Sequence, residues 1–333
     1  MMKPASNAFG RTFRRCAALA ALTIAAAAGA QEYPTKPIRI VVAWPPGGMA
    51  DTVARHVAPK LAGALGKRDL PVVVDNRGGA SGSLGTDIVA KSAPDGYTLL
   101  VAIDTHAVYP HINRSLSYNI FTDLAPISLA VKIPLAIVAH PSLPANSVKE
   151  LVILAKSKPG ALSYASGGAG TAGHIAAEQF KLLAGIDIVH VPYKGGAPAI
   201  ADLLGGQVQL SFIAVSGVFQ HVRANKLKAI ALSGTQRSAA LPDVLTTAES
   251  GFPQLDSGPW AGFLAPAGTP AAIVSRLSSE IANILKDPDV RGKLTEQAMD
   301  VVGSTPERFG ALIRSEHDKL GKLIKDANLN IAQ

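Results

Sequence analysis

Short runs of consecutive apolar residues alternate along the chain with longer segments in which apolar residues recur every three or four positions. The short runs predict strands at residues 38–43, 72–75, 97–103, 135–140, 162–166, 188–193, 208–214 and 227–233. Segments of helical length, such as residues 51–66 and 172–185, separate most of these runs. This alternation predicts an α/β fold with parallel-rich sheets, and the consecutive apolar positions predict helices on both faces of each sheet.

The pattern changes toward the carboxyl end of the chain. Thr269-Pro270 and Thr305-Pro306 each combine an N-cap residue with a proline suited to the first turn of a helix. Apolar residues at helical spacing follow both pairs: Ile273, Leu277, Ile281 and Leu285, then Phe309, Leu312, Ile313, Leu320 and Ile324. Two helices with no strand between them predict a cap over one sheet.

The length of the chain suits two lobes better than one. We expect residues 31–131 to begin lobe 1, residues 132–236 to form lobe 2, and residues 237–333 to return to lobe 1 with the C-terminal helices. The chain then crosses between the lobes twice, which makes a hinge with a cleft beside it.

The first thirty residues have the pattern of an export signal. Lys3, Arg11, Arg14 and Arg15 precede an apolar, alanine-rich run that is shorter than a spanning helix. Small residues at 28 and 30 predict cleavage near Ala30, whereas the alternative is a buried N-terminal helix. The single cysteine, Cys16, lies inside this segment, so we expect a mature protein without disulfides or cysteine-ligated metal.

Charge and composition narrow the expected partners. The net charge of +8 includes four positive residues and no acidic residue in the first thirty, which leaves +4 for the rest. This mild excess favours small anions, and no basic run with interleaved aromatic residues predicts nucleic-acid binding. No later segment is long and apolar enough to span a membrane, so we expect a soluble monomer.

Three glycine-rich loops each follow a predicted strand and precede a predicted helix. They read AWPPGGMADTVAR (43–55), NRGGASGSLGTD (76–87) and YASGGAGTAGH (164–174). The free N–H groups and positive dipole end of a helix N-terminus suit an anion. The alternative is three ordinary strand-to-helix turns, which favour the same residues.

Catalytic and nucleotide-binding motifs fit these loops poorly. GAGTAG (168–173) matches G-x-G-x-x-G, but no acidic residue ends the following predicted strand, as a dinucleotide site requires. Ser166 lacks the glycine two positions earlier that a nucleophile elbow needs. His106 and His111 could share a metal, although isolated core or loop histidines are commoner. We therefore expect no cofactor, no metal and no enzymatic activity.

Five blocks of the sequence, taken in order, resemble the substrate-binding proteins of tripartite tricarboxylate transporters, the Bug-type family. They are residues 38–55, 72–100, 162–180, 191–209 and 263–274. The resemblance implies a two-lobed periplasmic receptor of the type II-like binding-protein fold, with a small carboxylate held between the lobes. Implied first-lobe contacts are Pro46, Gly47, Gly48, Asp51, Ser81 and Gly82. Implied second-lobe contacts are Ser166, Gly167, Gly170, Thr171 and His174, with Tyr193 and Lys194 nearby.

The sequence departs from the family pattern after the run VQLSF, where Ile213 and Ala214 replace a polar pair. An acid there would suit a ligand ammonium group, so its absence favours an aromatic or dicarboxylic acid over an amino acid. Trp44, His106 and Tyr109 either line a distal apolar pocket or pack at the edge of the cleft. The resemblance implies delivery to a membrane carrier; a receptor for a sensor kinase and, less favoured, an exported hydrolase are the alternatives.

Overall fold

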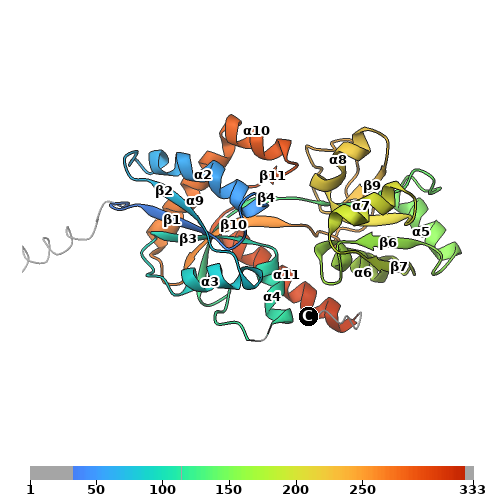
Figure 1. The fold of residues 1–333 in the computed structure, drawn as a ribbon, viewed down its shortest axis with the longest axis horizontal. Coiled ribbons are helices and arrows are strands. Elements are labelled where there is room, and N and C mark those ends of the chain that lie inside the picture. Colours follow the sequence, from blue (N-terminus) through green and yellow to red (C-terminus); the bar gives the residue numbers. More distant parts are fainter. Residues whose placement is uncertain (1–32, 114, 327–333) are drawn as a thin grey trace, which may run out of the picture.

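The computed structural model describes residues 33–113 and 115–326, so the predicted export signal lies outside the described residues. Two sheets, each covered by helices on both faces, lie toward opposite ends of an elongated molecule (Figure 1). We call the larger half lobe 1 and the smaller half lobe 2.

Lobe 1 is built on a six-stranded sheet in the order β11-β4-β10-β3-β1-β2. Its strands are β1 (Ile38–Val42), β2 (Val72–Asn76), β3 (Thr98–Ile103), β4 (Leu124–Lys132), β10 (Trp260–Pro266) and β11 (Asp300–Val301). Its helices are α2 (Met49–Ala64), α3 (Ser83–Ala90), α4 (Thr105–Ile112), α9 (Ala271–Lys286), α10 (Pro288–Glu296) and α11 (Pro306–Asp326), with a 3₁₀ turn η1 (Ala80–Gly82) before α3.

Consecutive apolar residues in β1 serve two different cores. Ile40 and Val42 pack with α2, α9 and α10 on one face of the sheet, and Val41 packs with α3, α4 and α11 on the other. All three side chains are fully buried. The run IRIVVA is therefore apolar throughout because helices cover both faces of its sheet.

Lobe 2 is built on a five-stranded sheet in the order β7-β6-β8-β5-β9. Its strands are β5 (Leu135–Ala139), β6 (Ser163–Ser166), β7 (Val189–Pro192), β8 (Leu210–Ala214) and β9 (Lys228–Leu232). Helices α5 (Val148–Ser157) and α6 (Ala172–Ala184) cover one face, and α7 (Gly196–Leu204) and α8 (Val215–Arg223) cover the other.

The predicted two-lobed α/β fold is confirmed, with sheets of mixed direction. Pairing is parallel among β1, β2 and β3 and among β6, β7 and β8. The strands next to the crossings, β4 and β10 in lobe 1 and β5 and β9 in lobe 2, are paired antiparallel. The parallel strands are thus the ones whose strand–helix connections include the glycine loops.

Two adjacent segments join the lobes. The first runs from β4 to β5 through residues 133–134, and the second enters β10 through residues 257–259. The Ile133 N–H donates to the Pro259 carbonyl at 2.8 Å. A Cβ on Gly258 would lie 2.2 Å from the Ile133 carbonyl oxygen, so only glycine lets the segments run this close together.

The second crossing comes later along the chain than residue 236, where the sequence analysis placed it. Residues 233–256 stay with lobe 2 because their backbone bonds to β9: the Thr247 N–H donates to the Leu232 carbonyl at 2.7 Å, and the Leu232 N–H donates to the Leu245 carbonyl at 2.9 Å. The expectation that no strand separates the two C-terminal helices was wrong. Helix α10 and the short strand β11 lie between α9 and α11.

Candidate functional site

The first glycine loop ends β1 and leads into α2. Its Asp51 is buried and faces the loop: its carboxylate accepts hydrogen bonds from the Gly47 N–H and Arg55 Nε, each at 2.9 Å, and from Asn76 Nδ2 at 3.0 Å. Burial alone would raise the pKa of Asp51, but these hydrogen bonds hold it below its ordinary value. Asp51 therefore fixes the shape of the loop, and Pro46, Gly47 and Gly48 remain exposed at the rim.

The second glycine loop holds four successive residues with positive φ. The angles are 136° at Gly79, 47° at Ala80, 52° at Ser81 and 89° at Gly82. Two of these residues carry a Cβ, which makes the left-handed conformation unfavourable. The Trp44 ring lies against Gly82, where a Cβ would come within 3.1 Å of it, and the buried Trp44 Nε1 has no hydrogen-bond partner.

A further loop of lobe 1 joins β3 to α4. It is followed by His106, whose side chain lies inside the lobe. The side chain is 3% exposed, its Nε2 is 2.8 Å from Thr86 Oγ1, and its Nδ1 bonds to the backbone of Ile103. Burial lowers the pKa of His106 to about 4, so the ring is neutral at neutral pH. Of the two alternatives for His106, the structure supports packing.

Hydroxyl groups of the lobe 2 glycine loop bond within the loop. Ser166 is fully buried, with its Oγ 2.7 Å from His190 Nε2 and 3.1 Å from the Gly168 nitrogen. The Thr171 hydroxyl donates to the Gly168 carbonyl at 2.8 Å. The Gly168 N–H donates to Ser166 Oγ and the Gly170 N–H to His174, so the groups left at the rim are mainly the N–H groups of the first turn of α6.

Two stacked histidines lie against the inner side of this loop. The His174 and His190 rings are 4.2 Å apart, and the Gly170 N–H donates to His174 Nδ1 at 3.1 Å. Burial lowers the pKa of both rings, that of His190 to about 4. Beside them, the Tyr164 hydroxyl donates to Glu178 at 2.6 Å. His174 is 7% exposed and holds the loop in place from behind.

The remaining predicted residues lie at the ends of β7 and β8. The Tyr193 hydroxyl donates to Asp202 at 2.7 Å, which directs it toward α7. Ile213 and Ala214 end β8, and Ala214 packs against the core clusters of both lobes. The carboxyl ends of the parallel strands in lobe 2 therefore face lobe 1 at this point.

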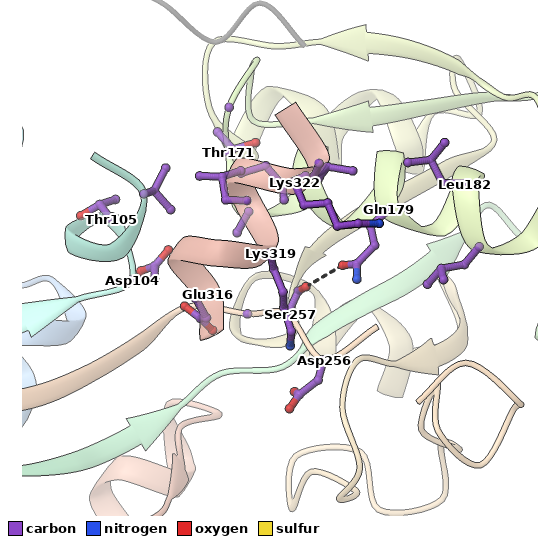
Figure 2. A pocket seen from close by; sticks show the side chains of 18 residues that line it. Asp104, Thr105, Thr171, Gln179, Leu182, Asp256, Ser257, Glu316, Lys319 and Lys322 are labelled. Atoms are coloured by element: carbon purple, nitrogen blue, oxygen red, sulfur yellow. Dashed lines mark hydrogen bonds between the residues drawn. The ribbon is translucent and has the colours of Figure 1, made fainter. Parts of the chain in front are cut away.

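A cavity of about 350 Å³ lies between the lobes beside the hinge (Figure 2). It brings Gly170 and Thr171 of lobe 2 together with Asp104 and Thr105 at the β3–α4 corner of lobe 1. The far wall consists of α6 and α11, and Asp256 of lobe 2 and residues 257–258 of the hinge also line it. The other predicted site residues are not part of its lining: Trp44, Pro46, Gly47, Gly48, Asp51, Ser81, Gly82, His106, Ser166, Gly167, His174, Tyr193, Ile213 and Ala214.

Asp104 and Glu316 were not among the predicted site residues. Glu316 accepts from Trp260 Nε1 at 2.5 Å. Burial and the nearby Asp104 raise the pKa of Glu316 to about 7, and burial raises that of Asp104 to about 6. A signal was available in the sequence, because Glu316 interrupts the apolar stripe formed by Phe309, Ile313 and Leu320 on α11.

Residues 33–113 and 115–326 contain neither a candidate metal site nor a candidate membrane span. No group of three or more histidine, cysteine or acidic side chains in that part of the chain is arranged to hold a metal ion. None of the helices described there has the length and hydropathy that a membrane span requires.

Comparison with known proteins supplies a family. The profile of the tripartite tricarboxylate transporter family receptor matches residues 53–329. BugT of Bordetella pertussis is 36% identical over 315 residues, which cover 94% of this chain and 96% of BugT.

Three solved structures, each 30% identical to this chain, cover nearly the same part of it. A TctC solute-binding protein from Polaromonas, solved with no ligand, has a TM-score of 0.80 and covers 88% of this chain and 99% of that chain. An R. palustris protein with adipate has a TM-score of 0.68 and covers 89% of this chain and 99% of that chain. MatC from Rhodopseudomonas palustris with bound malate has a TM-score of 0.64 and covers 88% of this chain and 100% of that chain.

Proposed function

The chain belongs to the tripartite tricarboxylate transporter family of periplasmic solute receptors, and from this premise we propose that it captures a small carboxylate between its lobes. The binding groups are backbone amides and hydroxyls at two facing rims. The lobe 1 rim contains Pro46, Gly47, Gly48, Ser81 and Gly82, and the lobe 2 rim contains Gly167, Gly170 and Thr171.

One observation carries this proposal: six helices begin where strands end at the two rims. In lobe 1, α2, α3 and α4 follow β1, β2 and β3; in lobe 2, α6, α7 and α8 follow β6, β7 and β8. Each helix start leaves N–H groups unbonded and has the positive end of the helix dipole. A hydrogen bond to a charged group contributes about 1.5–3 kcal/mol. A complex with a micromolar dissociation constant has a binding free energy of about 8 kcal/mol. Four or five such hydrogen bonds reach this value after the entropy cost of ordering the ligand and the loops is subtracted.

The ligand that these rims favour is a dicarboxylic or aromatic acid rather than an amino acid. Ile213 and Ala214 offer no charge to a ligand ammonium group at the end of β8. The solved relatives with adipate and with malate carry dicarboxylates. Because His106 is buried in lobe 1, only Trp44 and Tyr109 remain to contact an aromatic ring.

We infer that this lobe arrangement is an open state and that the lobes close on the ligand. At equal sequence identity, the TM-score is higher with the ligand-free relative than with the adipate and malate complexes. The rim residues Pro46 and Gly48 are exposed in this arrangement. Closure would bring them toward the lobe 2 rim, which gives each carboxylate donors from both sides.

The protein acts in the periplasm as a monomer and delivers its ligand to the membrane subunits of a tripartite carrier. The family supports delivery to a carrier, and a receptor that reports the same ligand to a sensor kinase is the second candidate. Hydrolysis has the least support. Ser166 is fully buried and bonded to His190, and burial lowers the pKa of that ring to about 4, which makes it a weak general base.

Melting curves and calorimetry with adipate, malate, citrate, terephthalate, benzoate and glutamate test the ligand class. A ligand bound only by the folded protein raises the melting temperature. We expect adipate, malate or terephthalate to bind in the micromolar range and to be recovered unchanged. Binding of glutamate alone would contradict the ligand class, and conversion of the ligand would contradict the receptor function.

Gly48→Ala tests the lobe 1 rim. The residue has an ordinary φ of −80°, and a Cβ there would meet no atom closer than 3.9 Å, so the fold tolerates alanine. The added methyl group would stand in front of the first amides of α2, and we expect carboxylate affinity to fall about tenfold with unchanged melting temperature. Gly292→Ala in α10, also in open space, is the matched control with unchanged affinity.

A further inference from the structure

Positive charge beside the lobe 1 rim is paired with acidic side chains of the protein itself. Arg55 Nε is 2.9 Å from the Asp51 carboxylate. Arg77 Nε is 3.0 Å from the Asp75 carboxylate. Neither cation can serve a ligand without giving up its own partner, so these pairs add little net charge to the cleft.

Lys194 lies at the lobe 2 rim, in the turn between β7 and α7, and its side chain is exposed. Among residues 33–113 and 115–326, no acidic side chain forms an ion pair with it. Its neighbour Tyr193 donates its hydroxyl to Asp202 at 2.7 Å, so this nearby acid already has a partner. Within the described part of the chain, nothing therefore neutralises the Lys194 ammonium group.

The backbone on both sides of Lys194 is fixed to the glycine loop of lobe 2. The Tyr193 N–H donates to the Ser166 carbonyl at 3.0 Å. The Gly195 N–H donates to the Gly167 carbonyl at 3.1 Å. Lys194 thus starts from a fixed point beside this loop, and its flexible four-carbon stem lets the ammonium group reach a ligand held there.

An ammonium group and a helix N-terminus recognise anions differently. The N–H groups at a helix start hold a carboxylate by directed hydrogen bonds at one fixed place. A lysine ammonium is a mobile point charge with three donors, which attracts a second negative group over a range of positions. A ligand with one carboxylate leaves this charge unpaired when closure removes it from water, and that weakens binding. The lysine therefore favours a ligand with two carboxylates.

We propose that Lys194 is a specificity-determining residue of the carboxylate site. The helix starts hold one carboxylate of the ligand, and the Lys194 ammonium pairs with the other. The inference rests on the proposed function, because it needs a carboxylate between the rims, and it narrows the ligand class to dianions. The relatives solved with adipate and with malate agree with it, since both ligands have two carboxylates.

Adipate and hexanoate are a matched pair of probes, because they have the same number of carbons and only adipate has a carboxylate at each end. Calorimetry on the mature protein at neutral pH measures both affinities. We expect adipate to bind at least about tenfold more tightly than hexanoate, as one charged hydrogen bond provides. Terephthalate and benzoate repeat the comparison with an aromatic ring.

Lys194→Gln removes the charge and keeps most of the stem. Because the side chain is exposed, we expect an unchanged melting temperature. Adipate affinity should fall about tenfold, whereas hexanoate affinity should change by less than about twofold. Lys194→Arg keeps the charge and should retain the preference for adipate. An equal loss for both acids, or no loss for adipate, would overturn the inference.

Two further variants are controls for position. Lys226→Gln changes another exposed lysine of lobe 2, which follows the end of α8 far along the chain from the rim, and both affinities should stay unchanged. Arg77→Gln removes a cation that is already paired with Asp75, so the preference for adipate should persist. If Arg77→Gln abolished that preference and Lys194→Gln did not, the second carboxylate would belong to lobe 1, which would overturn the assignment.

Ionic strength provides a readout that a purely structural role of Lys194 would not change. Salt screens an ion pair, so added sodium chloride should weaken adipate binding more steeply than hexanoate binding in the native protein. The two slopes should approach each other in Lys194→Gln. Slopes that are already equal in the native protein would contradict the ion pair.

This inference and the proposed function fail in different ways. Equal affinity for the two acids of each pair in the native protein would overturn the role of Lys194 and leave a carboxylate receptor. Binding of neither adipate and hexanoate nor terephthalate and benzoate would contradict the proposed function, and the inference with it.

Discussion

At the scale of single residues, the polar side chains of the glycine loops mainly shape the loops. Asp51 accepts three hydrogen bonds from its own loop and its neighbours, and the Thr171 hydroxyl donates to the Gly168 carbonyl. These bonds fix the backbone before any ligand arrives. A preorganised rim loses less entropy when it binds, which strengthens the complex without adding contacts.

Ser81 provides a test of backbone strain at the rim. Its φ of 52° lies in the left-handed region, where a Cβ costs about 1–2 kcal/mol. In Ser81→Gly the relief of this strain exceeds the entropy lost by glycine, so we expect stability to be unchanged or higher by up to about 1 kcal/mol. Ser83→Gly, at an ordinary φ of −63°, should lose about 0.5–1 kcal/mol. Chemical denaturation measures both, and equal losses would show that the loop carries no strain.

The sequence predicted where the glycine loops lie in the fold better than it predicted how each of their residues is bonded. Glycine spacing and position after apolar runs identify the three loops because these are local properties. The orientation of Asp51 depends on Asn76, and that of His106 on Thr86; both partners belong to other elements. Glu316 was missed for the same reason, since its partner Trp260 lies 56 residues away.

At the scale of elements, the most reliable predictions were the strands buried on both faces. All eight predicted strands are present, whereas β4, β10 and β11 were not predicted. β4 contains Pro126 and polar residues, β10 contains Gly262 and ends at Pro266, and β11 has two residues. Their pairing is fixed by neighbouring strands rather than by their own composition.

Gly173 tests why the third glycine loop resembles a nucleotide fingerprint. A Cβ at this position would lie 2.0 Å from the Phe212 carbonyl oxygen, so glycine is required for the close approach of α6 to β8. We expect Gly173→Ala to destabilise the protein by about 2 kcal/mol or more, because α6 must move away from the sheet. Gly63→Ala in α2, with 3.7 Å to its nearest neighbour, is the control for thermal denaturation. A stable Gly173→Ala variant would show that the packing is looser than described.

At the scale of the whole molecule, the two lobes are joined by a narrow hinge. Its two segments pair through Ile133 and Pro259, and Lys132 bonds to Asp256 beside them. The sequence predicted two lobes and two crossings, and it placed the first crossing next to β4. The second crossing could not be located from apolar patterning, because residues 233–256 bind lobe 2 mainly through irregular backbone hydrogen bonds.

The central claim is that a carboxylate is held by helix N-termini from both lobes at once. A crystal structure of the mature protein grown with adipate, or with the tightest acid of the panel, tests this most directly. We predict closed lobes and a carboxylate within hydrogen-bonding distance of backbone N–H groups at residues 48–50, where α2 begins, and also at residues 167–173, where α6 begins. A ligand bound to one lobe alone, or seated in the acidic cavity between α6 and α11, would contradict the account.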